Sequence, residues 1–210
     1  MKNKKIAAMA AVGTAVILTL CGTLAARTVF AAEERVSITS ENSGTMLQAL
    51  AGAEVMKVYK NSVYGDTGCT VVLPAGYVPS ESVKGMYLSE HHPLDSSNIY
   101  YTVSETVDTE SLEQMITSDA YKDRMEQKFQ KTYGTGASIS SFAYSRVTID
   151  GCPGYRIRLS CTVDDMQMDQ LTYIITADQT YTITYSQSAD DERMEAFEKS
   201  AETIRLVFGK

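Results

Sequence analysis

The last third of the chain, residues 137–208, most limits what the protein can fold into. It contains four short runs rich in β-branched and aromatic residues, each bounded by turn-forming residues. These runs cover residues 141–149, 155–163, 168–176 and 181–186. The connections between them are short and contain Asp, Gly or Pro, so neighbouring runs form hairpins and the segment predicts an antiparallel meander.

Side-chain alternation divides these runs into two faces. In the second run the apolar residues share one side of the strand, and the arginines and hydroxyl residues share the other. The apolar set is Tyr155, Ile157, Leu159, Cys161 and Val163. Apolar residues then recur at steps of three and four from Met194 to Phe208, which predicts an amphipathic helix. We expect this helix to cover the apolar face and Ser188 to be its N-cap.

The middle of the chain predicts a second helix and further strands. Asp108 is a candidate N-cap, and apolar spacing continues from Leu112 until Gly134 ends the helix. Upstream, residues 55–73 predict a hairpin, and residues 75–98 predict a long loop before the next strand. The predicted fold class is therefore α+β, an antiparallel β-sheet meander flanked by two amphipathic helices.

The N-terminal residues have the organisation of an export signal. Three lysines precede an apolar run that ends near Ala31. We therefore expect residues 1–31 to be a signal peptide, 32–54 a flexible tether and 55–210 the α+β domain. The protein is predicted to be secreted or to reside in the cell envelope. It would contact the membrane only through an uncleaved signal or a lipid on Cys21, and the bulky residue before Cys21 argues against the lipid.

The charge of the chain excludes one class of partner. The formal net charge is −7, and removal of residues 1–31 leaves 15 basic and 26 acidic residues, a net charge of −11. Such a surface repels nucleic acid and anionic lipid. We expect no nucleic-acid partner, and instead a protein or another cell-envelope component.

Two short sequence motifs, together with the predicted order of strands and helices, resemble the PsbP-like superfamily. They are GCTVVLPAGY at residues 68–77 and GCPGYR at residues 151–156, the second followed by the last strand and the final helix. The chain is similar to exported bacterial members over residues 55–208, although Cys69 and Tyr77 stand where an aromatic residue and a tryptophan are usual. The resemblance implies the fold and carries no shared catalytic residues, so we expect no cofactor.

Three cysteines follow the expected cleavage site, so at least one thiol has no partner within the chain. Export permits a disulfide, and Cys69 with Cys161 is the candidate pair if both face inward on neighbouring strands. The alternative is that both are small buried apolar residues. Cys152 lies in a predicted turn without a nearby His or Lys, which argues against a catalytic thiol.

The two histidines of the chain are candidate metal ligands in a loop. One alternative is an extracytoplasmic metal-dependent or hydrolytic enzyme that uses the 90–95 loop, with His91, His92 and Asp95 as its functional residues. Adjacent residues point to opposite sides of an extended chain, and a zinc site needs three or four converging ligands. No nucleophile elbow is present. We therefore predict no metal site and no catalytic residue, and keep the enzyme as an alternative.

The polar side of the second run holds Arg156 and Arg158, which are the candidate interaction face. Strand tyrosines left exposed on that side would suit a partner protein or a glycan, although the absence of tryptophan argues against carbohydrate binding. We favour an exported, non-catalytic accessory or protein-interaction domain. A cell-wall or glycan-binding module is the remaining alternative.

Overall fold

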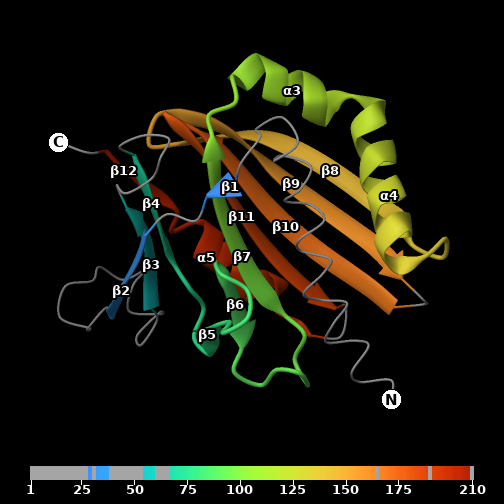
Figure 1. Cartoon of the computed structure of the whole chain (residues 1–210), viewed down its shortest axis with the longest axis horizontal. Coiled ribbons are helices and arrows are strands. Elements are labelled where there is room, and N and C mark those ends of the chain that lie inside the picture. The colour runs from blue at the N-terminus through green and yellow to red at the C-terminus, as the bar shows by residue number, and fades with distance from the viewer. Residues whose placement is uncertain are drawn as a thin grey trace.

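Two antiparallel sheets and three helices make up the described part of the chain in the computed structural model (Figure 1). The structure describes residues 28–29, 32–37, 54–59, 67–163, 166–188 and 191–208. The architecture is the predicted α+β class. It differs from the prediction by a third helix and a second sheet.

The large sheet contains the predicted meander. Its strand order is β5-β6-β7-β11-β10-β9-β8, and β1 pairs with β7. The strands are β1 (Thr28–Val29), β5 (Tyr77–Pro79), β6 (Met86–Ser89), β7 (Asn98–Glu105), β8 (Ser138–Ile149), β9 (Cys152–Val163), β10 (Met166–Thr176) and β11 (Gln179–Ser188). All four predicted runs of the meander are strands. Residues 75–98 are not a continuous loop, because β5 and β6 lie within them.

The turn between β8 and β9 contains two residues, which lie within the longer connection that the sequence predicts. Asp150 and Gly151 both have positive φ, 48° and 84°, as a type I′ turn requires. The Asp150 carboxylate also accepts a hydrogen bond from the backbone N of Leu206 at 2.7 Å. This hydrogen bond connects the β8–β9 turn to a residue near the C-terminus.

The small sheet has the order β12-β4-β3-β2. Its strands are β2 (Ala32–Ser37), β3 (Glu54–Tyr59), β4 (Gly68–Val72) and β12 (Arg205–Val207). β3 and β4 form the predicted hairpin. β2 lies within residues predicted to be a flexible tether, and β1 lies within the predicted signal peptide. Residues 1–27 and 38–53 lie outside the described residues, so the division into leader, tether and domain stays a prediction.

Two helices, not one, form in the middle of the chain. They are α3 (Thr109–Thr117) and α4 (Asp119–Tyr133), separated at Ser118. The predicted N-cap is confirmed, because Asp108 Oδ1 accepts from the backbone N of Ser111 at 2.8 Å. α4 ends at Gly134, as predicted. No helix of the described ranges is long and apolar enough to cross a membrane.

The C-terminal helix is shorter than predicted. α5 (Met194–Ala201) begins after Arg193, and the residues predicted to extend it instead form β12, which pairs with β4. Ser188 is not its N-cap, because it is the last residue of β11. Ser200, which is fully buried, contacts Tyr185 Oη at 3.2 Å and donates to the carbonyl oxygen of Val72 at 2.6 Å, so it joins the large sheet, α5 and the small sheet.

Each face of the large sheet has its own hydrophobic core. α3 and α4 pack on the apolar side of β9, which includes Tyr155 and Ile157. α5 and the small sheet pack on the opposite side, over β7, β10 and β11. The prediction that the C-terminal helix covers the apolar face of β9 is therefore wrong. Alternation correctly showed which residues of β9 share a side, but it could not show that α3 and α4 cover that side.

We expect Gly154→Ala to destabilise the fold. A Cβ at Gly154 of β9 would lie 2.4 Å from the carbonyl oxygen of Ile174 on β10, so the strands must move apart. Overpacking of this kind costs about 1–3 kcal/mol in the free energy of unfolding. Urea denaturation measures the change, and Ser145→Ala at an exposed position of β8 is the control, expected within about 0.5 kcal/mol of wild type. Equal stability of the two variants would contradict this close approach.

Candidate functional site

One carboxylate holds the segment between β6 and β7. Asp95 is buried and accepts hydrogen bonds from Ser97, through its backbone N at 2.9 Å and its hydroxyl. Arg193 donates Nε and Nη2 to Asp95 Oδ2 at 3.0 and 2.8 Å. Burial raises the pKa of Asp95, but the hydrogen bonds from Ser97 and Arg193 outweigh it and lower that pKa below its ordinary value. Asp95 therefore fastens this loop to the start of α5.

A second carboxylate reinforces this connection. Asp191 Oδ2 accepts from the hydroxyl of Ser96 at 2.8 Å, and from the backbone N and hydroxyl of Ser188 at 2.9 and 2.8 Å. Ser188 was predicted to accept hydrogen bonds from the first amides of a helix, but it instead donates to an aspartate that precedes α5. Both carboxylates act in holding three chain segments together.

The loop does not assemble the candidate metal ligands. His91 is exposed, His92 is half-buried, and the Asp95 carboxylate is occupied by Arg193. Within the described part of the chain, no group of three or more His, Cys, Asp and Glu residues could hold a metal ion.

Arg156 and Arg158 lie on the α5 side of β9 and share one partner. Arg156 Nη2 is 3.0 Å from Glu198 Oε1 on α5, and Arg158 pairs with the same oxygen. The Arg158 side chain is 49% exposed. Beside it, a depression of about 200 Å³ is lined by residues that include Asp169 and Met194. The two predicted arginines thus lie together on an accessible surface, which we call the arginine surface. The sequence did not reveal that Glu198, 40 residues after Arg158, is their partner.

The candidate disulfide is not formed. Cys69, Cys152 and Cys161 are all free thiols. Cys69 lies in the core on the α5 side of the large sheet, and Cys161 lies in the core under α3 and α4. Burial is the main cause that raises the pKa of both buried thiols to about 12, with nearby carboxylates adding to it. Burial and two aspartates also raise the pKa of Cys152, so none of the three is an activated nucleophile.

The strand tyrosines do not form an exposed binding face. Seven tyrosines lie in the runs that the sequence predicts to be strands of the large sheet, and five of these are buried: Tyr100, Tyr101, Tyr155, Tyr181 and Tyr185. Tyr173 is half-buried, and Tyr144 on β8 is 45% exposed. A glycan-binding surface built from stacked tyrosines therefore has little support in the described residues.

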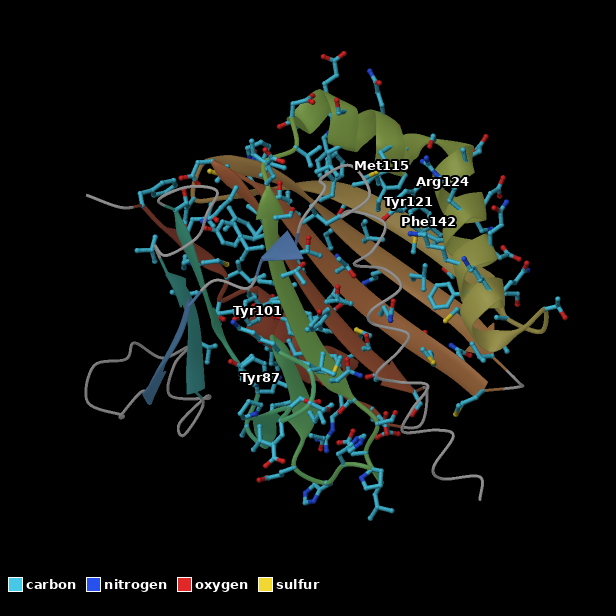
Figure 2. The ribbon with its side chains drawn as sticks, viewed as in Figure 1. Tyr87, Tyr101, Met115, Tyr121, Arg124 and Phe142 are labelled. Carbon is cyan, nitrogen blue, oxygen red and sulfur yellow. The ribbon has the colours of Figure 1, made fainter. Side chains whose placement is uncertain are left out.

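A groove that the sequence did not reveal lies beside Tyr144. It has a volume of about 420 Å³ and is bounded by the α3–α4 junction and β8, with Ile116, Lys122, Phe142 and Tyr144 among its lining residues. The rings of Phe142 and Tyr144 are 6.1 Å apart, and that of Phe142 is 5.7 Å from the buried Tyr121 (Figure 2). Finding the groove from sequence would have required knowing that α3 and α4 cover this side of the sheet.

Comparison with known proteins identifies the fold. No family model matches the sequence, and no curated protein sequence matches it. The solution structure of cyanobacterial PsbP from Synechocystis sp. PCC 6803 is similar, with a TM-score of 0.52 at 13% identity, over 73% of this chain and 92% of that chain. LpqN of Mycobacterium tuberculosis, involved in cell envelope biogenesis, has a TM-score of 0.44 at 10% identity, over 79% of this chain and 99% of that chain.

The molecule is an α+β protein in which helices cover both faces of an antiparallel sheet. More closely, it has a PsbP-like fold, as the resemblance in its sequence implied. At 13% identity the likeness concerns the fold alone.

We expect the Asp95 contacts to make stability depend on pH. Because folding lowers the pKa of Asp95, its contribution is present above the ordinary aspartate pKa and is lost as the pH falls through the folded-state value. Asp95→Asn should lower the free energy of unfolding by about 1–2 kcal/mol at pH 7, since Arg193 is partly exposed, and by much less at pH 3.

Urea denaturation at both pH values measures this difference. Asp123→Asn on α4 removes an exposed carboxylate and is the control. A loss of stability on Asp95→Asn that is the same at pH 3 and pH 7 would contradict an ionised, hydrogen-bonded Asp95.

Proposed function

We propose that the protein is an exported, non-catalytic accessory domain that binds another protein of the cell envelope through the arginine surface. The N-terminal sequence supports export. The placement of Arg156 and Arg158 on an accessible surface, around the shared carboxylate of Glu198, supports a binding role.

The observation that carries this proposal is the sharing of one carboxylate by two guanidinium groups. Glu198 neutralises one of the two positive charges and Asp169 lies in the depression beside Arg158, so this surface offers guanidinium donors rather than a net positive charge. On β8, Ala143 and Ser145 pair with Arg158 and Arg156 in the sheet register and are themselves exposed. The surface is thus accessible, with guanidinium donors that recognise a carboxylate well.

The partner is a protein that presents an acidic side chain to this surface. The chain carries a net negative charge that repels such a partner, so the guanidinium donors of Arg156 and Arg158 favour binding at this one face. A carboxylate of the partner would form charge-assisted hydrogen bonds with the donors that Glu198 leaves unused. The small apolar and hydroxyl residues of β8 allow close approach beside them.

We expect Arg156→Gln combined with Arg158→Gln to abolish partner binding while the domain stays folded. Cross-linking in cells that export the full-length chain, followed by affinity capture and mass spectrometry, identifies the partner. The double variant should recover it at least about tenfold less well, corresponding to about 1.4 kcal/mol. Lys131→Gln combined with Arg205→Gln removes two exposed positive charges elsewhere and is the matched control.

Glu198→Gln provides a test in the opposite direction. It leaves both guanidinium groups in place and removes their internal partner, so binding of an acidic partner should be equal to wild type or tighter. Undiminished capture by the double arginine variant would refute the proposed surface. Turnover of a substrate from a broad hydrolase panel by the purified protein would refute the non-catalytic role.

A further inference from the structure

The outer edge of β8 is open. β8 is the last strand on its side of the large sheet, and no other strand of the described residues pairs with that edge. Its sequence, SISSFAYSRVTI, contains no proline and no lysine, the residues that commonly block pairing at exposed edges. A twelve-residue edge with one charged side chain is a template for an added strand.

The groove lies directly along this edge. Phe142, Tyr144 and Arg146 pair with Leu159, Ile157 and Tyr155, so all three face the α3–α4 side of the sheet. Phe142 and Tyr144 line the groove, and Arg146 forms an ion pair with Glu113 of α3. An added strand would therefore place every second side chain into or beside the groove.

We infer that the occupant of this edge is β8 of a second copy, which pairs with it antiparallel about a two-fold axis at Tyr144. In this register Tyr144 meets Tyr144 of the other copy, and each Phe142 meets the other copy's Arg146. Aromatic pairs and arginine–aromatic contacts both stabilise neighbouring strands, so the same strand supplies complementary residues on both sides of the axis. Each exposed Tyr144 becomes buried against the groove.

The charges and the irregularity of β8 select this register among its neighbours. An axis at residue 145 would bring the two Arg146 side chains to a diagonal separation of about 7–8 Å, which is unfavourable for like charges. An axis at residue 143 would place the pairing irregularity between Ile139 and Ser141 opposite Arg146. With the axis at Tyr144, residues 141–147 pair regularly and the arginines lie about 13 Å apart along the strand, each with its own Glu113.

The mass in solution tests the pairing. We expect the full-length wild-type chain to be a dimer by light scattering and sedimentation, and Tyr144→Lys to raise the dimer dissociation constant at least about 100-fold, because two like charges then meet at the axis. Leu94→Lys is the matched control, since Leu94 is an exposed apolar residue of a different loop, 87% exposed. It should leave the dimer intact. A monomeric wild-type chain at every concentration tested would overturn the inference.

A cysteine at the axis tests the register. In a chain with Cys21→Ser and Cys152→Ser, Tyr144→Cys should form an intermolecular disulfide under mild oxidation, since opposed residues of neighbouring strands are close enough to bridge. Ser141→Cys in the same background should not, because its counterpart would lie about 20 Å away. Cross-linking through Ser141→Cys, or no cross-linking through Tyr144→Cys in a dimeric protein, would overturn this pairing. These variants leave Arg156 and Arg158 unchanged. The capture experiment with the arginine variants therefore tests the arginine surface separately from the dimer.

Discussion

The fold depends on a switch of the apolar side chains from one face of the large sheet to the other between β9 and β11. On β9 the apolar side chains face α3 and α4, whereas on β11 they face α5 and the small sheet. β10, between them, is apolar toward both, with Ile174 on one side and Leu171 on the other. No single helix can cover the apolar side chains of both β9 and β11, because they lie on opposite faces of the sheet. The chain therefore places α3 and α4 on one face, and α5 with the small sheet on the other. The remaining part of each face carries polar residues. On β10 and β11 these are hydroxyl and amide groups that bond across the strands, as Gln170 does with Ser186 at 3.0 Å.

The local parts of this fold could be predicted from sequence because short-range rules decide them. The strands of the meander, the Asp150-Gly151 turn, the Asp108 cap and the end of α4 all follow from alternation, positive φ and capping chemistry. The long-range parts could not. Helical spacing continues past Ala201, yet the residues that follow pair with β4, because a distant strand with an open edge outweighs a weak local preference. In the same way, periodicity cannot show which of two amphipathic helices covers which side of a strand.

The same division applies to the candidate residues. Arg156 and Arg158 were predicted to share a polar side of β9, and they do, because period-two alternation is a local property. Their partner Glu198 comes from α5, so its contact depends on the long-range assignment that sequence patterns missed. Asp95 shows the reverse case. Its proximity in sequence to His91 and His92 made it a candidate metal ligand, but its carboxylate accepts hydrogen bonds from Arg193, almost 100 residues away. A residue type indicates chemistry only after its nearest partners are known.

The two proposed surfaces are geometrically linked through β8. A two-fold axis normal to the sheet keeps the same face of both copies on the same side, so the arginine surfaces of the proposed pair become one continuous face. Three strand spacings separate the two β9 strands, a distance of about 14 Å. Ala143 and Ser145 then form its centre, flanked on each side by Arg156, Arg158 and Glu198. A partner with two suitably spaced acidic groups would bind both halves at once, and its second contact would form at a high effective concentration. Weak recognition by one Arg156–Arg158 pair would then be sufficient for specific binding of such a partner.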